Sequence, residues 1–160
     1  MVPVCDLCDQ YGDSIQVLIP IFTNYGQKSA FFGAVETIRT HEDNSKVRDS
    51  VLEDGCGRVL VVDGGASVKR SLLGGDLASK AAENSWVGIV INGAVRDSLE
   101  LANIDIGILA LNLVPMKTEK RGLGSRGIPI SIAGASINSG DWIYADQDGI
   151  IISTKPLHNG

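Results

Sequence analysis

Four residues at fixed spacing could together hold a small oxyacid against a divalent metal. Gly75 is followed by twenty residues, then by Arg96 and Asp97, and after two further residues by Glu100. A glycine exposes backbone N–H groups to an anion, a guanidinium grips a carboxylate or enolate with two donors, and carboxylates are ligands for Mg²⁺. This chemistry is possible only if folding brings the four residues together.

The strands and helices expected around these four residues predict that folding brings them together. Apolar runs at Arg58–Asp63 and Val87–Asn92 are typical of strands buried on both faces, which favours a parallel pair. Between them, Val68–Leu73 is compatible with a helix, and after a glycine pair a second helix is expected over Asp76–Asn84. The predicted fold class is therefore α/β, with a parallel strand–helix–strand core.

Element lengths place both ends of this unit at one edge of the sheet. A helix of about nine residues descends about 14 Å, and a strand of about six residues climbs about 20 Å. Gly75, at the helix start, and Arg96-Asp97, past the strand end, should therefore share an edge, with the Asp63-Gly64-Gly65 turn beside them. Ligands of open α/β sheets bind at this edge.

Structural roles could also explain these residues. The glycine pair could be only a helix break, and Asp97 could cap the turn that follows it. Arg96 could pair with a surface carboxylate, an interaction worth under about 1 kcal/mol. Spacing alone favours neither explanation.

Composition limits the classes of function. The 160 residues carry nineteen acidic and fourteen basic side chains, and the net charge of −5 argues against direct binding of nucleic acid. The length predicts one domain, residues 1–160. No apolar run is long enough to cross a bilayer, and the N-terminus lacks the pattern of a secretory signal. We therefore expect a cytoplasmic protein without a membrane partner.

The cysteines and histidines do not have the spacing of a zinc site. Cys5 and Cys8 read C-x-x-C, but such a site needs two further ligands, and Cys56, His41 and His158 offer no matching pair. We expect ordinary packing or exposed thiols here.

The polar run His41–Ser45 could face a ligand or begin a helix. We favour the helix start, with Asn44 or Ser45 as its cap and an end near Asp54, because capping accounts for these residue types.

The remaining elements are mostly scaffold. We expect a short helix at Asp6–Tyr11, strands at Phe31–Ile38, Ile104–Leu113, Ile128–Ala133, Trp142–Ala145 and Ile150–Ser153, and a polar loop at Met116–Gly127. That loop carries four basic residues, Lys117, Lys120, Arg121 and Arg126. A solvated surface is favoured for them over contact with an anionic substrate or a neighbouring subunit.

Longer stretches resemble a known family. Val59–Gly65, Gly88–Asp97, Asp105–Gly107 and Tyr144–Ile150 are similar, in order and spacing, to the RraA-like family. This family includes the regulator of ribonuclease E activity A and the class II 4-hydroxy-4-methyl-2-oxoglutarate aldolases. The resemblance covers almost the whole chain.

The resemblance implies a swivelling β/β/α fold, a ring-shaped homotrimer with sites between subunits, and a divalent metal such as Mg²⁺ or Mn²⁺. The family's aldolase signature is met by Gly75, Arg96, Asp97 and Glu100. It places the metal ligand on Asp97 and the substrate-binding arginine on Arg96. The substrate loop falls on Gly74, Gly75, Asp76 and Leu77.

Two positions depart from the best-studied aldolases. Gly75 stands where they carry aspartate, and the tail Lys155–Gly160 lacks the acid that reaches a neighbouring subunit's site. A methyltransferase function, also assigned within the family, is not favoured, because the chain has no G-x-G-x-x-G loop followed by a ribose-binding acid.

These observations lead to one hypothesis and one alternative. The hypothesis is a metal-dependent carbon–carbon lyase in which Arg96 and the loop amides stabilise the pyruvate enolate released from 4-hydroxy-4-methyl-2-oxoglutarate. A metal-bound water or a nearby carboxylate would remove the hydroxyl proton. Oxaloacetate gives the same enolate, so secondary decarboxylase activity is expected. The alternative is a regulator that binds and inhibits ribonuclease E without chemistry.

Overall fold

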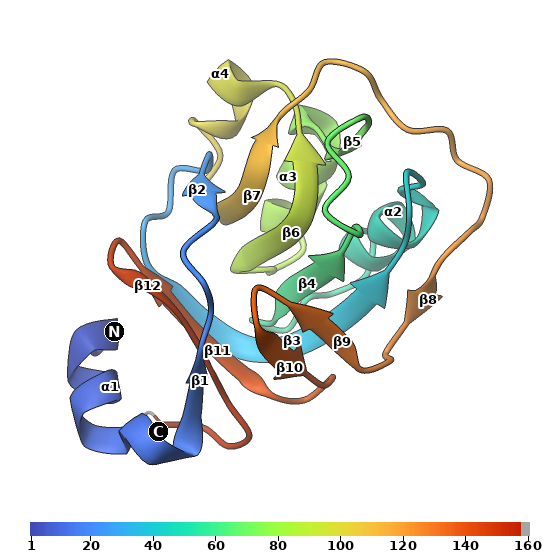
Figure 1. Cartoon of the computed structure of the whole chain (residues 1–160). Helices are drawn as coiled ribbons and strands as arrows, with labels where there is room; N and C mark the ends of the chain where they lie inside the picture. Colours follow the sequence, from blue (N-terminus) through green and yellow to red (C-terminus); the bar gives the residue numbers. More distant parts are fainter. Residues whose placement is uncertain (158–160) are drawn as a thin grey trace.

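A computed structural model of the chain describes residues 1–157 (Figure 1). Its helices are α1 (Val4–Tyr11), α2 (Ser45–Val51), α3 (Gly75–Glu83) and α4 (Ser98–Leu101), with a 3₁₀ turn, η1, at Gly12–Ser14. The strands are β1 (Ile15–Val17), β2 (Thr23–Asn24), β3 (Phe31–Arg39), β4 (Val59–Asp63), β5 (Ser71–Leu73), β6 (Gly88–Val95), β7 (Gly107–Leu113), β8 (Ser125–Arg126), β9 (Ile130–Ile132), β10 (Ala135–Ile137), β11 (Trp142–Asp146) and β12 (Gly149–Ser153).

Most of these strands form one mixed sheet. Its order is β1-β12-β11-β3-β4-β6-β7-β2, with β5 paired to β6 and β8 paired to β3. Strands β3, β4, β6 and β7 are parallel neighbours, and α3 connects β4 to β6 by way of β5. The predicted parallel strand–helix–strand core is confirmed.

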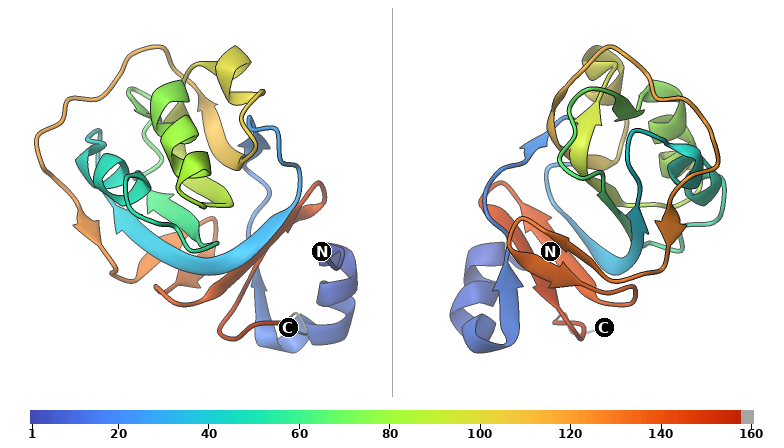
Figure 2. Two further views of the ribbon diagram at one scale, coloured as in Figure 1. Left: turned by 180° about the vertical axis from the view of Figure 1, so that it is seen from behind. Right: turned by 45° about the vertical axis from the view of Figure 1, so that its right-hand side comes forward.

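The apolar strands are buried because both faces of the sheet are covered. In β4, Leu60 and Val62 pack with the residues of α2 and α3, whereas Val59 and Val61 pack with those of β9, β10 and β11. Figure 2 shows α2, α3 and α4 together on one face, and α1 lies apart against β11 and β12. The layers are thus β/β/α, as the family resemblance implies. Among residues 1–157, no helix is long and apolar enough to span a membrane.

The prediction of a helix at Val68–Leu73 is wrong. The end of this segment is strand β5, which runs parallel to the last residues of β6. The N–H of Ser71 donates to the carbonyl oxygen of Met116 over 2.7 Å, and Leu72 and Leu73 are buried. These partners lie far away in the sequence, and they satisfy an extended backbone that a local pattern does not reveal.

The start of α2 also differs from the prediction. Asn44 occupies the N-cap position, but its side chain makes no capping hydrogen bond. Instead, Asp43 Oδ1 accepts a hydrogen bond from the N–H of Ser45 over 2.9 Å. The helix ends at Val51 rather than near Asp54, and the segment that follows is tied to another part of the chain, since the N–H of Gly55 donates to the carbonyl oxygen of Asn84.

Candidate functional site

The two ends of the crossover unit meet at one edge of the sheet. The N–H of Gly75, the first residue of α3, donates to Asp97 Oδ2 over 2.9 Å. The N–H of Arg96 donates to the carbonyl oxygen of Leu73, one residue before the glycine pair, over 3.0 Å. The prediction that Gly75 and Arg96-Asp97 share an edge is confirmed.

Asp97 does not use its side chain to cap its own helix. The residue precedes α4 and has left-handed backbone angles, φ 65° and ψ 47°, which aspartate tolerates better than most residues. Its carboxylate makes no capping bond to α4 and turns to the N-terminus of α3, where the helix dipole favours negative charge. The structural alternative for Asp97 is therefore wrong.

The glycine pair makes room for two carboxylates. A Cβ atom on Gly74 would lie 2.7 Å from Asp97 Oδ2, and a Cβ atom on Gly75 would contact the carboxylate of Glu100. Both acids thus reach the backbone at the start of α3. The pair is therefore more than a break before a helix.

Arg96 has no acidic partner among residues 1–157. Its Nη1 makes one long hydrogen bond, of 3.4 Å, to the carbonyl oxygen of Pro115. Among residues 1–157, no carboxylate forms an ion pair with it. The alternative of a surface ion pair is wrong for the described residues. The guanidinium, on a half-buried residue, can receive an anionic ligand.

A cavity of about 220 Å³ lies beside these groups. Gly74, Asp76 and Leu77 of the expected substrate loop border it, together with Arg96 and Asp97. The expected site residues Gly75 and Glu100 are not among the bordering residues, and the exposed Glu100 lies next to Gly75. The structure therefore brings most, but not all, of the expected set to the cavity wall.

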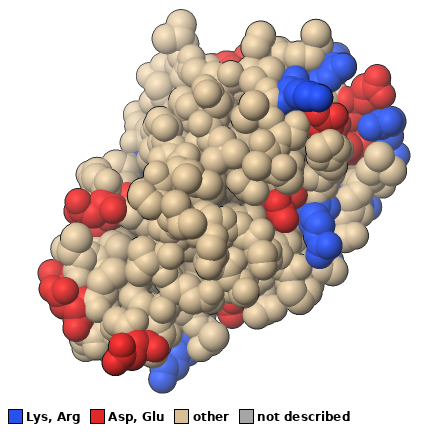
Figure 3. Space-filling model, in the orientation of Figure 1, with Lys and Arg blue, Asp and Glu red and all other residues tan. Residues whose placement is uncertain are grey.

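The cavity wall also contains residues that the sequence did not assign to a site. Arg48, Lys117 and Lys120 border it along with Arg96, so cations outnumber the two acids, Asp76 and Asp97. Lys117 and Lys120 are exposed, as expected, but they face this cavity rather than open surface alone. Figure 3 shows basic side chains over the part of the molecule where the long loop after β7 runs. The lining favours an anionic ligand.

Asp43 holds that loop against the start of α2. Its Oδ2 accepts a hydrogen bond from the N–H of Arg121 over 2.6 Å, and the Oγ of Ser45 accepts one from the N–H of Gly122 over 2.9 Å. Burial acts to raise the pKa of Asp43, but hydrogen bonds from Ser45, Arg121 and Leu123 outweigh it and hold the pKa below its ordinary value. An ionised, buried carboxylate therefore positions Lys117 and Lys120.

The carboxylates at the cavity can be compared with the ligands that a divalent metal ion requires. Asp97 borders the cavity, and within residues 1–157 its Oδ2 alone makes a hydrogen bond, so Oδ1 is available as a ligand. Among residues 1–157, no three or more His, Cys, Asp or Glu side chains cluster as a metal cage would require. Mg²⁺ is usually held by one or two carboxylates, with water and substrate as its other ligands. The residues present fit Mg²⁺ or Mn²⁺ better than zinc.

Other candidates from the sequence lie outside this cavity. Asp63 is at the same sheet edge, but its Oδ1 accepts hydrogen bonds from Gly65 and Asn92, and it borders a separate hollow. Cys5 and Cys8 are on α1, and His41 is exposed. His158, with the end of the acid-free tail, is outside the described residues.

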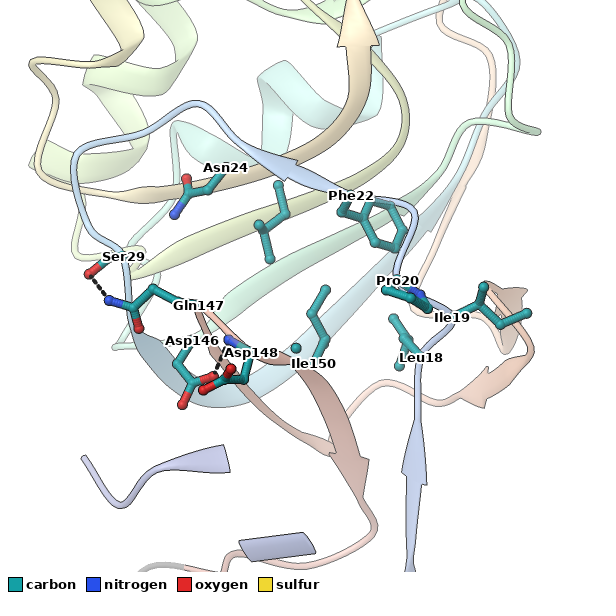
Figure 4. A pocket seen from close by; sticks show the side chains of 12 residues that line it. Leu18, Ile19, Pro20, Phe22, Asn24, Ser29, Asp146, Gln147, Asp148 and Ile150 are labelled. Carbon is teal, nitrogen blue, oxygen red and sulfur yellow. Dashed lines mark hydrogen bonds between the residues drawn. The ribbon is translucent and has the colours of Figure 1, made fainter. Parts of the chain in front are cut away.

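A second hollow of similar size, about 210 Å³, lacks the groups needed for an oxyacid (Figure 4). Leu18, Phe22 and Ile150 form an apolar wall, and no cationic side chain borders it. The carboxylate of Asp146 already accepts hydrogen bonds from the N–H groups of Val4 and Asp148. The cavity at Arg96 is therefore the candidate site.

Sequence comparisons identify similar proteins along nearly the whole chain. Residues 3–152 match the model of the RraA-like family, described as Aldolase/RraA. A protein of Alkalilimnicola ehrlichii is 48% identical over 156 residues, which are 98% of this chain and 97% of the relative. A protein of Marinomonas sp. is 52% identical over 152 residues, 95% of this chain and 94% of the relative. Both are named "Putative 4-hydroxy-4-methyl-2-oxoglutarate aldolase".

Two solved structures have nearly the same fold. The RNA-processing inhibitor RraA from Thermus thermophilis gives a TM-score of 0.96 at 40% identity, covering 99% of this chain and 96% of that chain. A protein from Geobacillus kaustophilus, described as an S-adenosylmethionine: 2-dimethylmenaquinone methyltransferase, gives 0.94 at 38% identity, covering 99% and 100%. The similar proteins carry three different functional names, so the names alone do not assign a function to this chain.

Proposed function

This chain belongs to the RraA-like family, and on that premise we propose that it is a divalent-metal-dependent lyase that cleaves 4-hydroxy-4-methyl-2-oxoglutarate to pyruvate. Relatives about half identical over nearly the full length carry the aldolase name. The proposal depends most on one observation: Asp97 is held at the N-terminus of α3, next to a guanidinium that has no acidic partner within residues 1–157, on a cationic cavity.

The reaction breaks the bond between carbons 3 and 4 of the substrate. The carbon 4 hydroxyl loses its proton, its oxygen forms the carbonyl of one pyruvate, and the bonding electrons pass to the other half as a pyruvate enolate. That enolate then takes a proton at carbon 3 to give a second pyruvate. The enolate oxygen is where negative charge develops, so the site must stabilise charge there.

Arg96 and the backbone of the glycine loop supply that stabilisation. The Arg96 guanidinium donates in a planar fork that matches a carboxylate and the adjacent keto oxygen. The positive end of the α3 dipole faces the same region. Asp97 would hold a divalent cation, which when bound supplies Lewis-acid polarisation of the keto oxygen. Glu100 would accept the hydroxyl proton through a water molecule.

The same residues would support loss of carbon dioxide from oxaloacetate. This reaction also leaves a pyruvate enolate, and it requires no removal of a hydroxyl proton. Arg96 and the loop amides would stabilise it in the same way. We therefore propose oxaloacetate decarboxylation as a secondary activity of one site.

A coupled assay tests the proposal. Pyruvate release from each acid is followed by NADH oxidation with lactate dehydrogenase, in the presence of Mg²⁺ or Mn²⁺ and again after chelation. Because metal ions decarboxylate oxaloacetate slowly in solution, each rate is corrected with a protein-free blank at the same metal concentration. Both activities are expected, lost on chelation and restored by added metal. Failure of the metal-loaded protein to release pyruvate from either acid would refute the lyase.

A second function is favoured by one structural relative. The RNA-processing inhibitor RraA shares 40% identity and a TM-score of 0.96 with this chain. We propose, as the alternative, that the chain inhibits ribonuclease E by binding it without chemistry. For either function we propose the ring-shaped homotrimer that the family resemblance implies. An RNA cleavage assay with the wild type and Asp97→Ala separates the functions, since inhibition by surface binding should survive this change.

A further inference from the structure

Two buried side-chain oxygens at the candidate cavity have no hydrogen-bond partner. Asn44 is 8% exposed and Thr118 is 4% exposed, and both border the cavity. Within residues 1–157, Asn44 Oδ1 and Thr118 Oγ1 are the buried side-chain atoms left unpaired. Burying a polar atom without a partner costs free energy, so such atoms need an explanation.

Elsewhere the fold satisfies its buried hydroxyl groups. Thr37 Oγ1 donates to the carbonyl oxygen of Ile128 over 2.6 Å, Thr40 Oγ1 to that of Asp43 over 2.6 Å, and Ser50 Oγ to that of Lys46 over 2.7 Å. The unpaired oxygens are thus confined to the cavity wall. Their position indicates a partner that the polypeptide does not supply.

Long-range contacts hold both residues in place. Asp43 takes the capping role at α2, which leaves the side chain of Asn44 unused by the helix. Asp43 also forms a parallel β-bridge with Glu119, which holds the segment of Asn44 and the segment of Thr118 side by side at the cavity. The unpaired oxygens therefore belong to an anchored wall of the site.

We propose that Asn44 and Thr118 bind the carbon 4 hydroxyl of the aldol substrate, an inference that rests on the proposed lyase function. Asn44 Oδ1 can only accept a hydrogen bond, whereas the hydroxyl of Thr118 can donate one. An alcohol satisfies both, since it donates to Asn44 and accepts from Thr118. A carboxylate cannot donate to Asn44 Oδ1. The two residues thus select substrates that carry a hydroxyl group, which oxaloacetate lacks.

The ratio of the two activities tests this role. Thr118→Val removes the hydroxyl and keeps the side-chain shape, and Asn44→Leu removes the acceptor at similar size. Each change should lower kcat/KM for the aldol about tenfold, the effect of one lost hydrogen bond. Decarboxylation of oxaloacetate should change by less than about twofold. The Tm of Thr118→Val should equal or exceed that of the wild type, because no protein hydrogen bond is lost.

Thr37→Val is the matched control. It removes a buried hydroxyl that is paired with Ile128, so it should lower the Tm and leave the ratio of activities unchanged. Equal slowing of both reactions in Thr118→Val, or a loss of Tm like that of the control, overturns the inference. Wild-type protein that releases pyruvate from neither acid would instead show that the lyase function itself is wrong.

Discussion

Asp97 Oδ2 accepts a hydrogen bond from the backbone N–H of Gly75 over 2.9 Å, and this contact joins the end of β6 to the start of α3. Oδ2 fixes the side chain against the helix N-terminus, and Oδ1, which makes no hydrogen bond within residues 1–157, is free to bind a ligand. A carboxylate held in this way needs little reorganisation before it binds a cation.

Replacing Asp97 should abolish lyase activity. Asp97→Ala removes the proposed metal ligand and the partner of the Gly75 N–H, so pyruvate release should fall by at least about 10²-fold. The coupled assay with both acids measures this loss, and circular dichroism checks the fold. Asp13→Ala removes an exposed carboxylate of η1 that does not border the cavity, and it should leave the rate unchanged. A rate for Asp97→Ala within about threefold of the wild type would contradict the assignment.

Glu100 occupies the space next to Gly75, so an acid at position 75 should compete with it. Gly75→Asp brings a Cβ atom and a second carboxylate against the Glu100 carboxylate, so both the Tm and the activity should fall. Gly75→Asp combined with Glu100→Ala relieves the crowding and should recover most of the lost Tm, whereas activity should stay low because Glu100 is the proposed proton acceptor. Gly12→Ala is the control, because a Cβ there meets no atom within 4 Å. If the losses of Tm measured for the two single changes simply add in the double variant, position 75 and Glu100 do not compete for the same space.

A positive charge at position 96 should not by itself be sufficient for lyase activity. Arg96→Lys keeps the positive charge but removes the planar pair of donors, so kcat should fall about 10²-fold for both acids. Steady-state kinetics of pyruvate release measure the change. Arg121→Lys provides the comparison, since that exposed side chain pairs only with the exposed Glu119 and should tolerate the change. Full activity in Arg96→Lys would exclude bidentate binding by Arg96.

Asp43 should make stability depend on pH in the acid range. Its pKa in the folded protein lies below the ordinary value near 3.8, so the ionised form stabilises the fold above about pH 4. This contribution is lost as the pH falls through the lower, folded-state pKa. Asp43→Asn should reduce the free energy of unfolding at pH 7 by about 1–3 kcal/mol, since its amide cannot accept all the same donors.

Urea unfolding of Asp43→Asn and the wild type at several pH values measures this effect. The difference in stability should narrow as the pH falls from 7 to below about 3. Gln10→Ala, at an exposed and uncharged position of α1, is the control, and its difference in stability should not vary with pH. A difference that stays constant with pH would show that ionisation of Asp43 does not stabilise the loop.

The sequence by itself determined the central unit of the fold and the meeting of Gly75 with Asp97. Buried strands produce continuous apolar runs, and the rise per residue of a helix and a strand fixes where each ends. These are local properties, so strands β4 and β6 and helix α3 could be located without knowledge of the remaining chain. The chemistry that the family resemblance implies was placed on the same residues.

Only the tertiary structure decided how the other wall of the site is built. Asp43 rather than Asn44 caps α2, and β5 is a strand rather than a helix, because partners distant in sequence compete with the local preference. The loop that carries Thr118 reaches the cavity through the hydrogen bond from Arg121 to Asp43, between residues 78 positions apart. A local pattern cannot show which distant donor a buried carboxylate will bind, so Asn44 and Thr118 were found only in the fold.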